Sequence, residues 1–202
     1  MLNELGIKHG TDKVGHGYLQ IYEEYLKRYQ EKRPIVNLLE IGVHLGASLR
    51  MWKEYLAGSN IHGIDNVSQK KEYEDDRIKI YIGSQEDGEF LRQVGSEIQP
   101  LNIIIDDGGH MMSQQIRSFF ELFPFLESGG LYFIEDLHTS YHKEFTGESI
   151  ITTVEHLKPI VDDINMHGYN YGNRKRLVLP SYYEQSVASI HFHKSICIIE
   201  KK

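Results

Sequence analysis

Carboxylates and histidines gather at a few points of the sequence, each directly after a short apolar run. Residues 106–110 read Asp-Asp-Gly-Gly-His, and the pair Glu135-Asp136 is followed closely by His138. Carboxylate oxygens are the ligands that Mg²⁺, Mn²⁺ and Ca²⁺ prefer. An imidazole titrates near neutral pH and can take up a proton. These residue types therefore indicate proton transfer assisted by a divalent cation.

The apolar runs before these residues alternate with stretches of helical periodicity. Strands are predicted at 35–41, 61–64, 78–82, 101–105 and 131–134, and helices at 18–29, 49–56, 87–94, 116–123 and 151–164. Such alternation is typical of βαβ units in a parallel sheet. The last two runs, 186–192 and 195–200, predict an antiparallel hairpin at the sheet edge. The predicted fold class is α/β, a doubly wound Rossmann-like sheet whose last strand is antiparallel.

The length of 202 residues fits a single domain, 1–202. Within it we expect a helical arm at 1–33, a cofactor-binding core at 34–136 and a substrate loop at 167–184. Polar residues between His9 and His16 either cover the cofactor or lie at the surface.

The loop after the first predicted strand has the pattern E-x-G-x-x-x-G, formed by Glu40, Gly42 and Gly46. Its middle holds His44, whereas a dinucleotide fingerprint has a glycine that lets phosphate approach. Asp65 lies 19 residues after Gly46, where an acid commonly accepts hydrogen bonds from ribose hydroxyls. A ribose without a nearby phosphate suggests S-adenosylmethionine. Alternatively, the two glycines serve only close packing of strand and helix.

Ligands of open α/β sheets bind beyond the carboxyl ends of the strands. Ser84 and Gln85 follow the third strand and Asp106 the fourth, so we assign all three to the cofactor site. Asp106 and Asp107 could instead cap the next helix, where carboxylates favour the N-terminus.

Asp107, Glu135 and Asp136 are the predicted metal ligands. The fourth and fifth strands are neighbours in the predicted sheet, so their carboxylates meet at one edge. Three carboxylates there form a hard oxygen site for Mg²⁺, with Mn²⁺ or Ca²⁺ as alternatives. A dication would also offset their mutual repulsion.

His110 follows Asp107 by three residues and is the predicted catalytic base. The hydroxyl group of an acceptor is a weak acid, and coordination to a dication would lower its pKa enough for an imidazole to remove the proton. A metal ligand or a structural residue are the alternative roles of His110. His138 is the second candidate base.

The order of these motifs resembles that of class I S-adenosylmethionine-dependent methyltransferases. The resemblance rests on E-I-G-V-H-L-G (40–46), H-G-I-D (62–65), I-I-I-D-D-G-G-H (103–110) and the C-terminal hairpin 189–200. More narrowly, these motifs and the segment from His9 to Tyr18 resemble the catalytic domain of the metal-dependent macrocin and mycinamicin type of sugar O-methyltransferases. That resemblance implies the same three metal ligands, His110 as the base, and the strand order 3-2-1-4-5-7-6 with strand 7 antiparallel.

We therefore predict Mg²⁺-dependent methyl transfer from S-adenosylmethionine to a sugar hydroxyl of a glycoside or polysaccharide precursor. The alternatives are a catechol-type methyltransferase acting on an aromatic diol and a cofactor-binding partner subunit without turnover. The formal charge of −7 disfavours nucleic acid as a partner. The absence of a signal segment or a long apolar run predicts a cytoplasmic protein that does not span a membrane. The oligomeric state stays open, with a homo-oligomer among the options.

Overall fold

The computed structural model describes residues 1–32, 35–147, 149–166 and 181–202. The predicted substrate loop, 167–184, thus lies largely outside the described residues. Among the described residues, no helix combines the length and the apolar character that crossing a bilayer requires.

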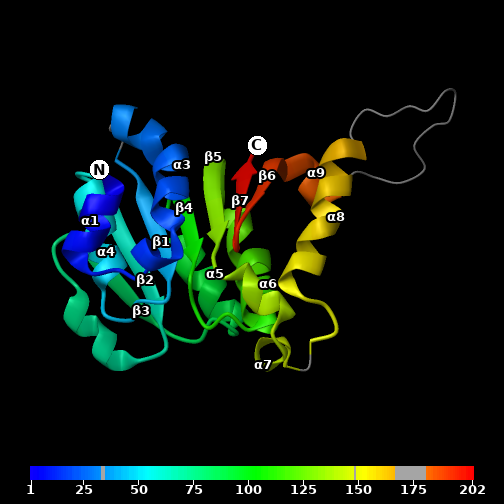
Figure 1. The fold of residues 1–202 in the computed structure, drawn as a ribbon, viewed down its shortest axis with the longest axis horizontal. Helices are drawn as coiled ribbons and strands as arrows, with labels where there is room; N and C mark the ends of the chain where they lie inside the picture. Colours follow the sequence, from blue (N-terminus) through cyan, green and yellow to red (C-terminus); the bar gives the residue numbers. More distant parts are fainter. Residues whose placement is uncertain (33–34, 148, 167–180) are drawn as a thin grey trace, which may run out of the picture.

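A seven-stranded sheet of order β3-β2-β1-β4-β5-β7-β6 forms the centre of the molecule (Figure 1). Its strands are β1 (Asn37–Ile41), β2 (Asn60–Asp65), β3 (Ile78–Ile82), β4 (Leu101–Asp106), β5 (Leu126–Ile134), β6 (Val187–His193) and β7 (Ile196–Lys201). The strands β1 to β5 pair in parallel, and β7 runs antiparallel to both β5 and β6. The predicted fold class and strand order are confirmed.

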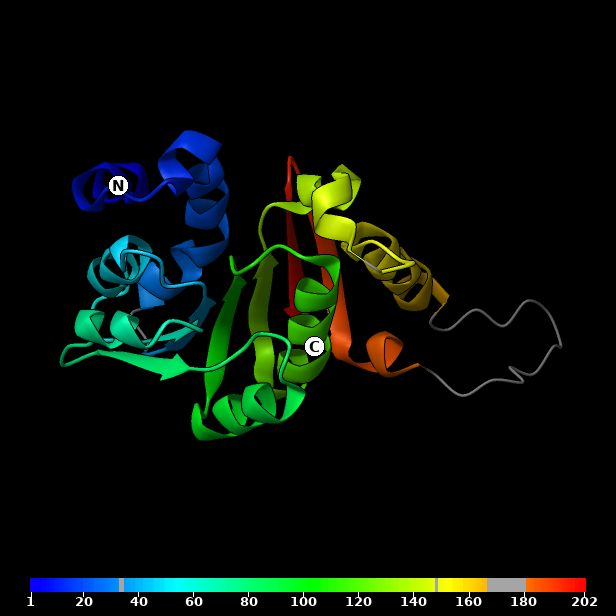
Figure 2. The same cartoon turned by 90° about the horizontal axis from the view of Figure 1, so that it is seen from below.

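Helices cover both faces of this sheet (Figures 1 and 2). They are α1 (Leu2–His9), α2 (Lys13–His16), α3 (Tyr18–Lys32), α4 (Ala47–Tyr55), α5 (Gly88–Glu97), α6 (Met112–Leu122), α7 (Lys143–Thr146), α8 (Thr153–Met166) and α9 (Tyr182–Ser186), with 3-10 turns η1 (Ser68–Tyr73), η2 (Phe123–Phe125) and η3 (Leu137–Tyr141). One hydrophobic core joins α1, α3 and α4 to the sheet, and a second joins α5, α6 and α8 to the opposite face. Strands buried on both faces explain the continuous apolar runs of the sequence.

The N-terminal arm contains a helix that the periodicity did not predict. The buried residues of helix α1 are Leu2 and Gly6. Because one of the two is a glycine, the segment lacks the apolar periodicity that would predict a helix. A Cβ at Gly6 would come within 2.3 Å of the Leu19 side chain, so α1 packs closely on α3 through this glycine. Gly10 ends the helix in the left-handed conformation, φ 74°, which is a common C-terminal cap. Gly10 is the signal that could have located the helix.

Two other boundaries differ from the prediction. Strand β5 begins at Leu126, so Gly129 and Gly130 lie inside it, beside an irregularity in the pairing with β4. Helix α6 begins only at Met112, which leaves residues 107–111 as a loop. Asp106 and Asp107 therefore do not cap that helix.

Gly42 brings the ends of β1 and β4 into contact. Its φ is +95°, and a Cβ at this position would lie 2.1 Å from the carbonyl oxygen of Asp107. The amide of Asp107 in turn donates a hydrogen bond of 3.0 Å to the carbonyl of Ile41. This close approach holds the loop that carries Asp107 against the glycine loop after β1.

We expect Gly42→Ala to lower the free energy of unfolding by at least about 3 kcal/mol, because strained backbone and steric overlap add. Gly129→Ala is the matched control, since Gly129 has φ +75° but nothing within 4 Å of its added Cβ. The control should lose only about 1–2 kcal/mol. Urea unfolding of both variants measures the difference, and equal losses would show that the contact with Asp107 does not constrain Gly42.

Candidate active site

A cleft of about 580 Å³ lies beyond the carboxyl ends of the parallel strands. This volume falls within the usual range for small-molecule sites. Four strand ends and the N-terminal arm supply most of its lining: Gly42–Leu45 after β1, Asp65–Val67 at β2, Gly83–Gln85 after β3, Asp107–His110 after β4, and Gly10–Asp12. We call this the first pocket.

Five of the eight predicted cofactor residues line the first pocket: Gly42, His44, Asp65, Ser84 and Gln85. The other three, Glu40, Gly46 and Asp106, are not among the lining residues. Glu40 and Asp106 are completely buried beneath it.

Asp65 stabilises the glycine loop through its carboxylate. Its Oδ2 accepts hydrogen bonds from the backbone amides of Val43 (3.1 Å) and His44 (3.3 Å). Its Oδ1 accepts one from the amide of Val67 at 2.9 Å. The carboxylate thus links the ends of β1 and β2 while it faces the pocket.

Asp106 and Gln85 form a buried network under the pocket floor. The Gln85 amide group donates to Asp106 Oδ1 at 2.7 Å and accepts from the backbone amide of Gly109 at 3.1 Å. Burial raises the pKa of Asp106 to about 6, although hydrogen bonds from Ser118 and Gln85 oppose the shift. Asp106 therefore supports the pocket floor from below, through Gln85.

A second pocket, of about 510 Å³, adjoins this edge of the sheet. Its lining combines the N-terminal arm, the segment after β5 and the β6–β7 turn: Gly15, His16, Tyr18, Asp136, Leu137, His138, Tyr141, Val154, Phe192, His193, Lys194 and Ser195. The lining is rich in aromatic rings and imidazoles.

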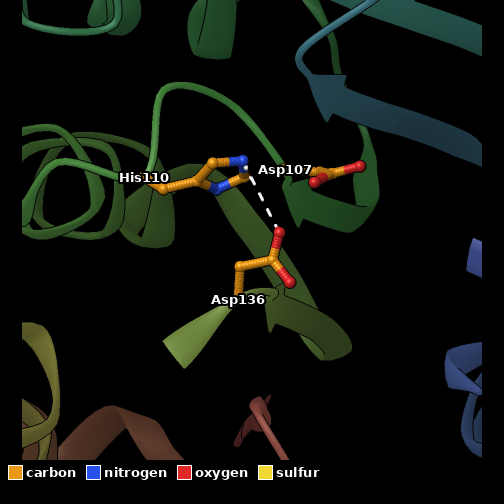
Figure 3. Close-up of side chains that lie close together, drawn as sticks. All are labelled: Asp107, His110 and Asp136. Carbon is orange, nitrogen blue, oxygen red and sulfur yellow. Dashed lines mark ion pairs between the residues drawn. The ribbon is translucent and has the colours of Figure 1, made fainter. Parts of the chain in front are cut away.

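Asp107, His110 and Asp136 converge where the two pockets meet (Figure 3). Each offers one ligand atom, and these atoms all lie within 4.8 Å of one another. His110 Nε2 lies 3.6 Å from Asp136 Oδ2. Asp107 and His110 line the first pocket and Asp136 lines the second. A ligand atom from either pocket can therefore reach the same group.

Unusual backbone conformations accompany this convergence. Among the described residues, the non-glycine positions with positive φ are His44 (47°), His110 (59°), Asp136 (55°) and Ser195 (67°). Such conformations cost energy in non-glycine residues and concentrate at functional sites. Three of the four are predicted site residues, and the fourth contacts His138.

Glu135 is not part of the group formed by Asp107, His110 and Asp136. Its Oε1 accepts hydrogen bonds from Tyr22 Oη at 2.5 Å and from Lys13 Nζ at 2.7 Å, and its side chain is 1% exposed. The sequence predicts that Lys13 belongs to a segment that either covers the cofactor or lies at the surface, and it does not pair Lys13 with carboxylates. No spacing signal could have found this pair, because 122 positions separate Lys13 from Glu135.

The buried charges at this edge do not balance. Glu40, Asp107, Glu135 and Asp136 face the single ammonium group of Lys13 and the polar hydrogens of Tyr18, Tyr22 and Ser48. Burial alone would lower the pKa of Lys13, but the charges of Glu135, Asp107 and Glu40 hold it well above its usual value. Burial raises the pKa of Glu135, against the effect of Lys13 and with that of Asp107. This surplus of negative charge fits a divalent cation.

His138 flanks Asp136 on the side of the second pocket. Its Nδ1 lies 2.7 Å from Ser195 Oγ and 3.8 Å from Asp136 Oδ1. His16 Nδ1 approaches the same Oδ1 at 3.8 Å, and Tyr18 Oη donates to it at 2.7 Å. Asp136 therefore lies among polar side chains of the arm, His16 and Tyr18, and of η3, His138.

No family model matches the chain, but individual proteins do. It is 35% identical to the 8-demethyl-8-alpha-L-rhamnosyl tetracenomycin-C 2'-O-methyltransferase of Streptomyces olivaceus, over 98% of this chain and 54% of the relative. It is 33% identical to the mycinamicin VI 2''-O-methyltransferase of Micromonospora griseorubida, over 99% of this chain and 52% of the relative. The chain spans about half the length of the curated relatives it matches.

A solved structure of a methyltransferase is also similar to this chain. The MycE methyltransferase from the mycinamycin biosynthetic pathway, in complex with Mg, SAH and mycinamycin VI, superposes with a TM-score of 0.89 at 32% identity. The match covers 99% of this chain and 53% of MycE. The resemblance predicted from the motifs is confirmed, because the homologues of this chain are sugar O-methyltransferases.

We expect Tyr22→Phe to lower the free energy of unfolding by about 1.5–3 kcal/mol, because Glu135 loses a hydrogen bond inside the protein. Tyr132→Phe is the control, since the Tyr132 hydroxyl is equally buried but has no hydrogen-bond partner among the described residues. Removing that hydroxyl should leave stability unchanged or raise it. Chemical denaturation compares the two, and a similar response from both would contradict the role of Tyr22.

Proposed function

We propose that the chain is a Mg²⁺- and S-adenosylmethionine-dependent O-methyltransferase that acts on a sugar hydroxyl of a glycoside or polysaccharide precursor. One observation carries the proposal: Asp107, His110 and Asp136 converge between two pockets, one beside the glycine loop and one lined by aromatic rings and imidazoles. The sugar O-methyltransferases among the relatives support it, as does MycE bound to Mg and SAH.

The first pocket is the cofactor site in this proposal. Gly42 lets a ligand lie against the turn after β1, and the Asp65 carboxylate accepts hydrogen bonds from ribose hydroxyls. Thr11 and Asp12 of the arm close the pocket from the other side. S-adenosylmethionine supplies the reactive methyl group on its sulfonium centre.

The residues at the meeting point of the pockets fit a magnesium ion. Asp107 and Asp136 offer hard oxygen ligands, and Glu135 lies next to Asp136 in the chain, as the predicted third carboxylate. Mg²⁺ supplies positive charge that stabilises the negative charge developing on an acceptor oxygen. Lys13 and Tyr22 meanwhile hold Glu135 by its Oε1.

The second pocket is the acceptor site. Tyr141 and Phe192 offer apolar ring faces to a sugar, and His16 and His138 offer hydrogen-bonding nitrogens. A hydroxyl directed towards Asp136 also comes within reach of His110. His110 Nε2 is the nitrogen that faces Asp136, so it is the atom that takes the proton. The protein orients the acceptor hydroxyl next to the methyl donor, and it supplies one proton acceptor, His110.

An aromatic diol is the second candidate acceptor, because the same rings of Tyr141 and Phe192 would stack on it. The single-domain boundaries, a homo-oligomeric state and a cytoplasmic location stay predictions from the sequence.

We expect Asp65→Ala to weaken binding of S-adenosylhomocysteine by about 1.5–3 kcal/mol, because the ribose hydroxyls lose a charged acceptor. Asp76→Ala is the control, since Asp76 is exposed and pairs with Lys53 away from the pocket. Isothermal titration calorimetry on both folded variants measures the effect. Unchanged affinity in Asp65→Ala would remove Asp65 from the cofactor site.

Methyl transfer should require a divalent cation and a sugar acceptor. We expect turnover with a panel of glycosides to stop in EDTA and to return with Mg²⁺, because the carboxylate cluster needs a neutralising ion. Full activity in chelator would contradict the metal site. Turnover of catechols alone would favour the aromatic diol, and cofactor binding without any turnover would favour a partner subunit.

We expect His110→Gln to lower kcat by about 10²–10⁴ while changing affinity for S-adenosylhomocysteine far less. His138→Gln, across Asp136, is the comparison variant and should retain most of the activity. A larger loss of kcat in His138→Gln than in His110→Gln would identify His138 as the catalytic base. Recovery of His110→Gln by excess Mg²⁺ would instead make His110 a metal ligand.

A further inference from the structure

Lys13 has a completely buried side chain, which is rare for lysine unless it is paired. Its Nζ lies 2.5 Å from Asp107 Oδ2, 2.7 Å from Glu135 Oε1 and 3.1 Å from Glu40 Oε1. An ammonium group carries three donors and no acceptor. Two of these donors make hydrogen bonds, to Asp107 and Glu135, and Glu40 forms an ion pair with the same ammonium group.

These three carboxylates come from three neighbouring strands. Glu40 lies in β1, Asp107 directly follows β4 and Glu135 directly follows β5, and β4 pairs with both β1 and β5. Burying such charges without a partner is costly, and pairing them is the usual solution. The one ammonium group thus holds together the ends of three strands that would otherwise repel one another.

Lys13 also belongs to the N-terminal arm, at the first position of α2. The residues just before it, Gly10–Asp12, line the first pocket, and Gly15, His16 and Tyr18 just after it line the second. Lys13 therefore lies, along the chain, between the residues of the arm that line the first pocket and those that line the second. Tyr18 adds a hydrogen bond to Asp136, but Lys13 carries the charge.

We infer that Lys13 is a positioning residue: its ammonium group is a fixed internal cation that holds the carboxylates of Glu40, Asp107 and Glu135 together and thereby holds residues 10–18 over both pockets. The inference rests on the proposed function only in naming the pockets as cofactor and acceptor sites. Lys13 itself touches no reacting atom.

Lys13→Met tests this role, because methionine is a long, unbranched and uncharged replacement. Lys8→Met is the matched control from the same arm, since Lys8 is exposed and pairs with Glu54 at the surface. Hydrogen exchange in EDTA measures whether residues 10–18 stay in place. We expect their amides to exchange about tenfold faster in Lys13→Met and at the wild-type rate in Lys8→Met.

A second measurement separates charge from packing. Without Lys13 the carboxylates depend more on an added cation, so Mg²⁺ should raise the melting temperature of Lys13→Met by about 4 °C more than that of the wild type. A residue that only fills space would give the same Mg²⁺ shift in both proteins. Equal shifts together with wild-type exchange of residues 10–18 would overturn the inference.

Lys13→Met in combination with Glu40→Gln covers the case in which the single variant fails to fold. The double variant removes one of the buried charges left unpaired, while Asp107 and Glu135 still lack their ammonium partner. We expect it to fold and still to exchange residues 10–18 rapidly, and slow exchange there would overturn the inference. If the wild type binds neither Mg²⁺ nor S-adenosylhomocysteine, the proposed function fails, and the exchange rates still decide the role of Lys13.

Discussion

Repulsion between buried and half-buried carboxylates is the constraint on which this structure depends. A parallel sheet brings the carboxyl ends of its strands to one edge, and here those ends carry Glu40, Asp107, Glu135 and Asp136. Such a cluster is stable only if positive charge and hydrogen-bond donors surround it. The N-terminal arm supplies Lys13, Tyr18 and Tyr22 for this purpose.

The arm is therefore part of the site. It contributes residues to both pockets, and it reaches the strand ends because α3 packs on the sheet through Tyr18, Leu19, Tyr22 and Leu26. One face of α3 thus serves stability and function together, since the same tyrosines that fill the core direct their hydroxyl groups at Glu135 and Asp136.

The division into two pockets follows from the backbone at the ends of β4 and β5. His110 and Asp136 both adopt positive φ, which turns their side chains towards each other from adjacent strands. Holding non-glycine residues in this conformation costs energy that the packed sheet must offset.

The sequence by itself determined the sheet and the edge at which polar residues gather, because buried parallel strands leave continuous apolar runs and ligands bind where such strands end. The strand order was predicted from the resemblance of its motifs to methyltransferases. The sequence also placed five of the predicted cofactor residues, among them Asp65 and Gln85, in one pocket. Only the tertiary structure decided which carboxylates face one another. It paired Glu135 with Lys13 and Tyr22, and it brought His110 to Asp136 from the loop that precedes α6. Those contacts join residues far apart in the chain, and their geometry depends on side-chain packing and local φ values that periodicity and spacing do not encode.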